Sequence, residues 1–344
     1  MIKPKTAVYI GRFSPFHNGH YETLKYAHQN YDQVIVLIGS GNKRRSPKNP
    51  FDTDVICKWI FDSFPKTVIK EIKDYGYDET KWISQVETVV SEVAKYPITI
   101  VGHSRDDSSY YLKEFPNWSF EEVGVFADDI NGTGIRSRYF NPNSSMTEIF
   151  QLESLVPYQV YYYLKENLNT DWYKKIQEEI EFFKNEKEMF STYPFPETLK
   201  FSCSDMIVNC NANILLIKRK FAPGKDTWAL PGGYTNQNER FLDGAVRELF
   251  EETGIKVSER VIRNCIIDSH VFDNPNRNEG IPRVSNAFYA EIEPDFVGNN
   301  YPKLPKVSAS DDAAEARWFS LSEIKNMKLF DDHAEVIDYF TKSL

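Results

Sequence analysis

Two histidines three residues apart stand near the start of the chain, in the stretch GRFSPFHNGH at residues 11–20. His17 and His20 follow Gly11 and Arg12, and their spacing places both imidazoles on one side of a helix. Imidazoles beside the free N–H groups of a helix start can donate hydrogen bonds to phosphate oxygens. The stretch therefore predicts a phosphate-binding turn, although two histidines at this spacing are usually structural when nothing else supports them.

Glutamates crowd a second stretch, GYTNQNERFLDGAVRELFEETGI at residues 233–255. Its apolar residues recur at helical spacing and predict a buried face, namely Leu242, Ala245, Val246 and Leu249. Glu248, Glu251 and Glu252 fall together on a different face, where they repel one another unless cations lie between them. Hard oxygen ligands favour Mg²⁺ or Mn²⁺, which would bridge a diphosphate and activate a water, with Glu239 as a further ligand. The alternative is an ordinary solvated acidic face.

The elements that must hold the two histidines have the pattern of a parallel α/β sheet. Residues 6–10 and 33–39 are strand-like, and residues 18–30 between them are polar with helical spacing. A third strand is predicted at 97–103 and a weaker one at 121–129. We therefore expect an α/β fold with a doubly wound, Rossmann-like parallel sheet, whose ligands bind at the carboxyl ends of the strands.

The elements around the glutamates differ, because short strand-like runs from Phe201 onward surround one helix at 240–253. This pattern predicts an α+β domain, which helical stretches join to the first domain. We expect the two domains to span residues 1–168 and 199–344, with a helical connector at 169–198.

Composition limits what the protein can bind. The chain has 344 residues, a net charge of −9, and 22 Lys and Arg against 29 Asp and Glu after residue 170. An acidic second half argues against nucleic-acid binding, which rests on neutralising phosphates, and suits a divalent metal. The sequence shows no run that could span a bilayer, no cleavable apolar start and no CxxC pair. We expect a cytoplasmic protein with no nucleic-acid or membrane partner, and leave open whether it forms a homo-oligomer.

The first stretch resembles the GRFxPxHxGH signature of the HxGH nucleotidyltransferases. Residues 130–136, INGTGIR, resemble that family's ISxTxIR segment, with Asn131 in place of the serine. Residues 102–118, GHSRDDSSYYLKEFPNW, resemble the GxxRDxxxYxxxFPxW stretch of archaeal-type nicotinamide mononucleotide (NMN) adenylyltransferases. Residues 49–60 match the NPF-containing region of those enzymes loosely and lack its arginine. The resemblance covers residues 1–168.

This resemblance implies that a nucleotide phosphate attacks the α-phosphate of ATP in line, with pyrophosphate as the leaving group. His17, His20 and Arg136 would be the catalytic residues, since they would neutralise charge on the leaving group. The implied substrate-binding residues are Gly11, Arg12, Phe13, Gly102, Arg105, Asp106, Trp118, Thr133 and Ile135. Trp118 would stack on a nicotinamide ring, or be an ordinary core tryptophan. The basic run NKRRSPK at 42–48 would contact phosphates, or form a solvated loop.

The second stretch agrees with the Nudix signature at every fixed position. The Nudix family cleaves nucleoside diphosphates that are linked to another group. The resemblance implies that Glu251 and Glu252 are catalytic and that Arg247 orients one of the glutamates. The implied metal ligands are Glu239, Glu248, Glu251 and Glu252, with Mg²⁺ or Mn²⁺ as the cofactor.

The substrate of the second half is indicated by a further resemblance. Residues 268–286, DSHVFDNPNRNEGIPRVSN, resemble a segment of ADP-ribose hydrolases. This resemblance implies that Arg277 binds the substrate, and Gly233 of the glycine loop is a further candidate for substrate binding. Residues 311–324 resemble the closing segment of the same enzymes. The general base stays open among Glu239, Glu251 and Glu315.

Both resemblances together imply a fusion of an NMN adenylyltransferase with a Nudix domain that cleaves ADP-ribose. The first half would make NAD from ATP and NMN, and the second would hydrolyse ADP-ribose to AMP and ribose 5-phosphate. One alternative keeps the fold and changes the acceptor to a nicotinate nucleotide or phosphopantetheine. A second alternative makes the Nudix half a sensor that binds ADP-ribose without cleaving it.

Overall fold

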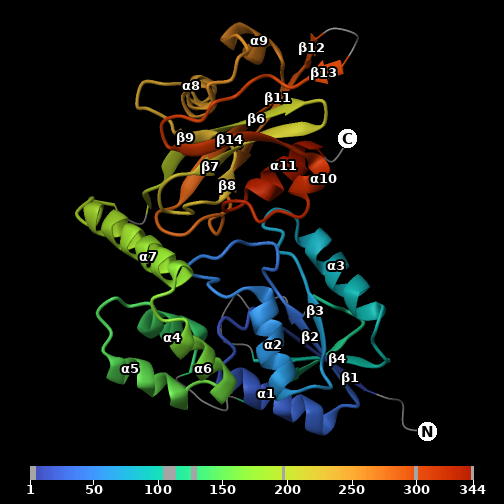
Figure 1. The fold of residues 1–344 in the computed structure, drawn as a ribbon. Coiled ribbons are helices and arrows are strands. Elements are labelled where there is room, and N and C mark those ends of the chain that lie inside the picture. Colours follow the sequence, from blue (N-terminus) through green and yellow to red (C-terminus); the bar gives the residue numbers. More distant parts are fainter. Residues whose placement is uncertain (1–4, 104–113, 125–129, 196–197, 298–300, 342–344) are drawn as a thin grey trace. The chain divides into compact units, whose positions relative to one another are not determined.

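The computed structural model describes residues 5–103, 114–124, 130–195, 198–297 and 301–341 (Figure 1). The chain divides into two units, Met1–Gln177 and Glu178–Leu344, and each has a sheet of its own. The boundary falls within one long helix, α7 (Asp171–Met189), so the first turns of this helix belong to the first unit and the rest to the second.

The first unit contains a five-stranded sheet in the order β3-β2-β1-β4-β5, and each neighbouring pair is parallel. Its strands are β1 (Thr6–Gly11), β2 (Gln33–Ile38), β3 (Val68–Glu71), β4 (Ile98–Gly102) and β5 (Ser119–Glu122). With β1 at the centre, the chain builds outward first on one side and then on the other. The strand order confirms the predicted doubly wound parallel sheet, and it makes the carboxyl ends of β1 and β4 neighbours.

Helices connect and cover these strands. They are α1 (Asn18–Asn30), α2 (Thr53–Ser63), α3 (Glu79–Ser91), α4 (Gly132–Tyr139), α5 (Met146–Gln151) and α6 (Tyr158–Glu166), with a short 3-10 helix at Leu152–Ser154. Val86 and Val90 of α3 pack into the core that Val8, Ile35 and Ile100 form on the sheet. This buried face fixes the strands whose ends carry the first site.

The second unit contains a seven-stranded mixed sheet. Five strands follow the order β10-β11-β6-β7-β14, while β8 pairs with β7 and β9 pairs with β6. The bounds are β6 (Phe201–Cys210), β7 (Asn213–Arg219), β8 (Trp228–Ala229), β9 (Gly232–Tyr234), β10 (Ile266–Phe272), β11 (Arg283–Ile292) and β14 (Ala313–Ser320). The sheet is mixed because β11 pairs with β6 in parallel, whereas the other pairs are antiparallel. A separate hairpin joins β12 (Asp295–Val297) to β13 (Tyr301–Lys303).

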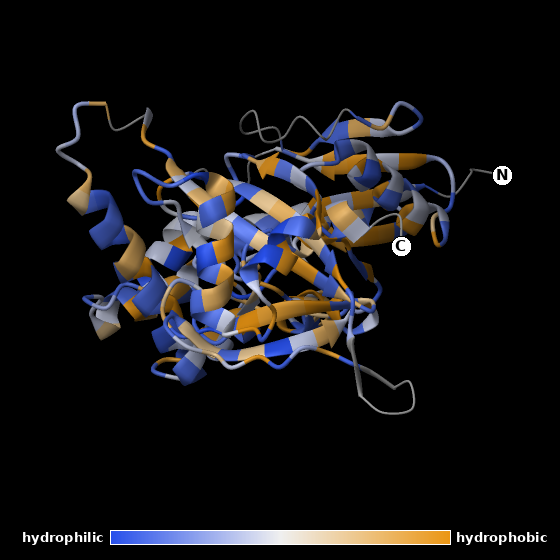
Figure 2. Cartoon of the chain, turned by 90° about the horizontal axis from the view of Figure 1, so that it is seen from above, coloured by the Kyte–Doolittle hydropathy of each residue, from blue (hydrophilic) through white to orange (hydrophobic). Residues whose placement is uncertain are grey.

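Helices cover both faces of this sheet. Besides α7, they are α8 (Phe241–Thr253), α9 (Glu259–Asn264), α10 (Leu321–Ile324) and α11 (His333–Thr341). Successive residues of β6 point to opposite faces, so that Met206 and Val208 join the core beneath α8, and Ile207 joins the core beneath α11. Two-sided burial explains why the strands are strongly apolar in Figure 2.

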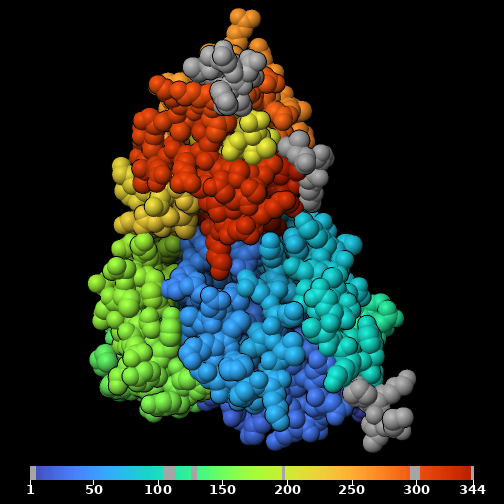
Figure 3. Space-filling model, turned by 45° about the vertical axis from the view of Figure 1, so that its right-hand side comes forward, coloured from blue at the N-terminus to red at the C-terminus, as the bar shows by residue number. Residues whose placement is uncertain are grey.

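Distant segments meet at the surface of the second unit as well. In Figure 3 residues near position 210, in yellow, lie among residues beyond 310, in red. Leu321 N–H donates to the carbonyl of Ala212 across this boundary at 3.1 Å. Within the described residues, no helix combines the length and apolarity that crossing a membrane requires.

Candidate active sites

The histidine stretch forms the turn between β1 and α1. His17 is the N-cap of α1 and is 4% exposed. Its backbone N–H donates to Nδ1 of His20 at 3.2 Å, and the two rings stack with their centroids 3.6 Å apart. Because Nδ1 of His20 accepts this bond, Nε2 carries the proton in the neutral ring. Phe13 is buried and its ring lies edge-on to that of His20, so it fixes the orientation of the imidazole.

The start of α4 lies against this turn. Arg136 donates from Nη1 to the carbonyl of Ser14 at 2.5 Å and from Nη2 to the hydroxyl of Thr133 at 3.1 Å. Asn131 accepts from Gly134 N–H at 2.7 Å, so asparagine caps the helix as a serine would. A Cβ on Gly132 would lie 3.0 Å from both Arg136 Nη1 and Ser14 O, so a larger residue would push these two groups away from the start of α4. The fold thus brings Arg136 and the histidine turn together.

The other residues predicted for this site lie in different surroundings. Arg12 is exposed, and Ile135 is a buried residue of α4. Gly11 is the last residue of β1, and Gly102 is the last residue of β4. Two further predicted substrate-binding residues, Arg105 and Asp106, fall outside the described residues. Trp118 stacks on Phe115 with their centroids 4.6 Å apart and packs against the sheet core. Its stacking on a nicotinamide ring stays a prediction.

The basic run at 42–48 is an ordered part of the first unit. Arg44 is 8% exposed. Arg45 forms an ion pair with Asp52, and its guanidinium lies 4.4 Å from the ring centroid of Trp172. The structure therefore differs from a solvated loop here, because Arg44 is buried and an aromatic ring covers the guanidinium of Arg45.

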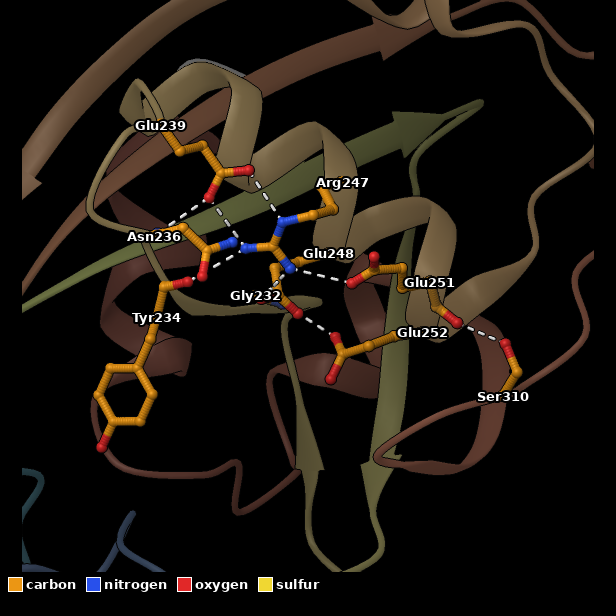
Figure 4. Close-up of polar contacts among 9 residues, drawn as sticks. All are labelled: Gly232, Tyr234, Asn236, Glu239, Arg247, Glu248, Glu251, Glu252 and Ser310. Atoms are coloured by element: carbon orange, nitrogen blue, oxygen red, sulfur yellow. Dashed lines mark hydrogen bonds and ion pairs between the residues drawn. The ribbon is translucent and has the colours of Figure 1, made fainter.

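The glutamates of the second unit gather around Arg247 (Figure 4). The guanidinium donates to both carboxylate oxygens of Glu239, at 2.8 and 3.0 Å. It also donates to Glu248 at 2.7 Å and to Glu251 at 2.9 Å. Arg247 therefore binds three of the predicted ligands, where the sequence led us to expect one partner. A Cβ on Gly233 would lie 2.7 Å from Glu248 Oε1, so a larger residue here would displace the Glu248 carboxylate.

Glu252 is held differently, since it accepts from Gly232 N–H at 3.0 Å and is 4% exposed. Burial raises the pKa of Glu252 to about 8, and it also raises the pKa of Glu248. The hydrogen bonds from Arg247 lower the pKa of Glu239 to about 2. Buried carboxyl groups on adjacent turns are costly when ionised unless a cation neutralises them, and their oxygens are suitable ligands for a hard divalent ion.

No group of three or more His, Cys, Asp or Glu side chains in the described part of the chain already has a metal-binding arrangement. The reason is visible in Figure 4, where oxygens of Glu248 and Glu251 face the guanidinium of Arg247. Ion binding would therefore require these two carboxylates to turn from Arg247. The donor types fit a divalent cation, whereas the arrangement of the side chains does not yet hold one.

A cavity of about 440 Å³ opens beside these glutamates. Glu248 and Glu252 line it together with Gly232 and Gly233. The remaining walls come from several elements of the second unit. They include Phe183 of α7, Asp205 of β6, Arg219 of β7, Arg283 of β11 and His333 at the start of α11. This volume lies in the range of small-molecule sites.

Arg277 lines the cavity as well, but an aspartate holds its guanidinium. It donates to both carboxylate oxygens of Asp332, at 2.8 and 2.9 Å, and the two side chains are 6% and 3% exposed. In this arrangement Arg277 fixes the segment around residue 277 to the start of α11. Glu315, one candidate for the general base, is exposed on β14 opposite Lys218 and is not among the lining residues.

Sequence reasoning missed several residues of this cavity. Asp205 and Arg283 lie on strands, Phe182 and Phe183 on the expected connector, and His333 on the last helix. No local spacing links them, because tertiary packing alone brings them together. Asp205 lies in the strand FSCSDMIVNC, where three consecutive apolar residues follow it, so the sequence of β6 gives no separate signal for a cavity residue.

Each unit of the chain matches a known protein family. Residues 203–340 match the NUDIX domain family, and residues 8–60 match the Cytidylyltransferase-like family. The chain is 31% identical over 184 residues to a nicotinamide/nicotinic acid mononucleotide adenylyltransferase of Acinetobacter baylyi, covering 52% of this chain and 94% of the relative. It is 33% identical over 136 residues to an ADP-ribose pyrophosphatase of Methanocaldococcus jannaschii, covering 39% of this chain and 70% of the relative.

One solved structure is similar over both units. A bifunctional NMN adenylyltransferase/ADP ribose pyrophosphatase from Francisella tularensis, complexed with AMP and a Mn ion, aligns with a TM-score of 0.86. The two chains are 31% identical, and the match covers 99% of each. The parallel sheet with its histidine turn and the mixed sheet with its glutamate helix define a nucleotidyltransferase joined to a Nudix domain. The chain belongs to the family of bifunctional NMN adenylyltransferase/ADP-ribose pyrophosphatases.

Proposed function

We propose that this chain is a bifunctional enzyme of NAD metabolism. The first unit transfers AMP from ATP to NMN, giving NAD and pyrophosphate. The second unit hydrolyses ADP-ribose to AMP and ribose 5-phosphate. The observation that carries the proposal is the alignment of both units with the Francisella enzyme over 99% of each chain.

In the first reaction the protein binds and orients the phosphates without forming a covalent bond. The β1–α1 turn presents the Nε2–H group of His20 toward the phosphate site, and Arg136 adds a positive charge anchored to Ser14. Both groups are fixed before the reaction, so they stabilise charge on the leaving pyrophosphate without reorganisation. In-line attack by the NMN phosphate then depends on holding the two nucleotides together.

In the second reaction Glu239, Glu248, Glu251 and Glu252 are the proposed ligands of Mg²⁺ or Mn²⁺. When bound by these carboxylates, a divalent ion would supply charge neutralisation at the diphosphate and would lower the pKa of an attacking water. Arg247 positions Glu239 and keeps it ionised, and Gly232 N–H orients Glu252. Of the three candidates for the general base, Glu239 and Glu251 adjoin Arg247, whereas Glu315 is exposed on β14.

The direct test incubates the purified chain with ATP, NMN and Mg²⁺, and separately with ADP-ribose and either Mg²⁺ or Mn²⁺. We expect NAD and pyrophosphate in the first reaction, and AMP with ribose 5-phosphate in the second. Nicotinate mononucleotide and phosphopantetheine serve as competing acceptors. Failure to form NAD, or binding of ADP-ribose without release of AMP, would refute the corresponding half of the proposal.

We further propose that the enzyme works in the cytoplasm. Its four cysteines, Cys57, Cys203, Cys210 and Cys265, form no disulfide, as is usual in a reducing compartment. ATP and NMN are the small-molecule partners on this proposal, together with NAD and ADP-ribose. Localisation of the tagged full-length chain tests the compartment, and export of the protein would contradict it.

A further inference from the structure

His333 is a buried histidine of the Nudix cavity that the metal chemistry does not use. It begins α11, is 7% exposed and lines the cavity. Leu230 N–H donates to its Nδ1 at 2.8 Å. Because a backbone N–H is always a donor, Nδ1 carries no proton, and the neutral ring holds its proton on Nε2.

The position and charge state of this ring are both fixed. His333 N–H donates to the carbonyl of Phe330 at 3.0 Å, and the imidazole packs edge-on against the Phe330 ring. The adjacent Asp332 is tied to Arg277 by two hydrogen bonds. Burial lowers the pKa of His333, which keeps the imidazole neutral. A neutral donor held this firmly is suited to recognising an uncharged acceptor.

A carboxylate accompanies this donor on the cavity wall. Asp205 of β6 is 6% exposed, lines the same cavity and accepts a hydrogen bond from the hydroxyl of Ser285. It is close enough to His333 and to Glu252 to act electrostatically on both. The wall thus offers an N–H donor and a carboxylate acceptor near the glutamate site.

A sugar hydroxyl matches this pair better than a phosphate does. Three aspartates, Asp205, Asp331 and Asp332, and one arginine, Arg277, act electrostatically on His333, so negative charge prevails around the ring and disfavours an anionic ligand group. A hydroxyl both accepts a hydrogen bond and donates one, so it can satisfy His333 and Asp205 at once. Ribose presents two such hydroxyls on adjacent carbons.

We propose that Asp205 and His333 form a subsite for ribose hydroxyls in the Nudix cavity, in which His333 donates through Nε2–H and Asp205 accepts. The subsite rests on the proposed hydrolysis of ADP-ribose and specifies how the sugar of that substrate is recognised. His333 acts in ligand recognition and takes no part in the bond cleavage.

Two substitutions separate recognition from structure. His333→Asn keeps an oxygen that can accept from Leu230 N–H but removes the donor at the Nε2 position. His333→Gln places an amide near Nε2 but withdraws the acceptor from Leu230. His270→Asn is the matched control, because His270 lies on β10 of the same unit, stacks on Tyr339 and does not line the cavity.

Binding is measured by calorimetry on the full chain carrying Glu252→Gln, so that the ligand is not hydrolysed. The probes are ADP-ribose, ADP, and the analogues of each that lack one ribose hydroxyl. We expect the parent protein to bind a hydroxylated ligand about tenfold more tightly than the matching deoxy analogue. His333→Asn should abolish this preference, His333→Gln should retain part of it, and His270→Asn should leave it unchanged.

The two ligands identify which ribose is bound. If His333→Asn weakens the binding of ADP-ribose but not of ADP, the subsite holds the terminal sugar. If the substitution weakens the binding of both ligands, the subsite holds the adenosine ribose. Equal binding of hydroxylated and deoxy ligands by the parent protein would overturn the proposal, even if His333→Asn failed to fold. Persistence of the preference in His333→Asn would overturn it as well. Hydrolysis by the unmodified chain is assayed separately, so a missing activity is not mistaken for a missing subsite.

Discussion

At the scale of single residues, Arg136 links the two segments of the first site. Its guanidinium bonds both Ser14 of the histidine turn and Thr133 of α4. Arg136→Ala should lower the rate of NAD synthesis about 100-fold, the usual loss when one fixed donor to a developing charge is removed. Steady-state kinetics with ATP and NMN measure the effect. Arg138→Ala, an exposed arginine of the same helix, is the control, and equal losses in both variants would refute the assignment.

Glu252 gives a prediction about pH at the same scale. Burial raises its pKa from 4.5 to about 8, so between these values the folded carboxyl holds a proton that the unfolded one has released. Rising pH therefore lowers the free energy of unfolding, by at most about 1.4 kcal/mol per pH unit. Urea unfolding in the presence of a chelator should show this fall in the free energy of unfolding between about pH 5 and 8. The Glu252→Gln variant should lack it. Parallel pH curves for the two proteins would contradict the burial effect.

The residues differ in how far the sequence could reveal them. The sequence showed Asn131 in place of a serine, and the structure adds that Asn131 caps α4 by accepting a hydrogen bond from Gly134 N–H. The multiple partners of Arg247 were only partly predicted, because spacing shows which side chains share a face and not which way they turn. Asp205 and His333 were not predicted, since no pattern along the chain joins β6 to α11.

At the scale of elements, α7 does more than connect. Glu186 is 8% exposed; it accepts from Ile281 N–H at 2.9 Å and pairs with Arg283, beside the cavity. Glu179, about two helical turns earlier in α7, accepts a hydrogen bond from Gly224 N–H at 2.8 Å. The second part of α7 therefore holds two of the segments that form the cavity walls.

This role of α7 predicts a local loss of stability. Glu186→Ala leaves Arg283 buried without its carboxylate, which should lower the free energy of unfolding of the second unit by about 3 kcal/mol. Denaturant unfolding and the KM for ADP-ribose measure the change together, and we expect KM to rise. Glu188→Ala, an exposed glutamate of the same helix, should change stability by less than about 0.5 kcal/mol. If the two variants lose the same stability, α7 does not hold the cavity wall.

The strands were predicted better than the loops, for a physical reason. A buried strand must be apolar, so residues 6–10, 33–39 and 97–103 were recognisable, and β1, β2 and β4 confirm them. The basic run at 42–48 gave no comparable signal. Arg44 is buried, and Trp172 from much later in the chain lies over the guanidinium of Arg45, which no local composition indicates.

At the scale of the whole molecule, the chain carries two sites with opposite electrostatics. The first uses nitrogen donors on a parallel sheet, and the second uses carboxylates on a helix beside a mixed sheet. The histidine and glutamate stretches indicated this division, and the larger acidic excess after residue 170 agrees with the second site. The predicted limits of the domains stay a prediction, although the structural boundary within α7 lies inside the expected connector.

The account depends most on two chemically independent sites in one chain. The decisive measurement assays NAD synthesis and ADP-ribose hydrolysis side by side in the unmodified protein, in Arg136→Ala and in Glu252→Gln. We predict that Arg136→Ala loses only NAD synthesis and that Glu252→Gln loses only hydrolysis, by at least about 100-fold in each case. Loss of both activities in either folded variant, or full hydrolysis in Glu252→Gln, would contradict the account.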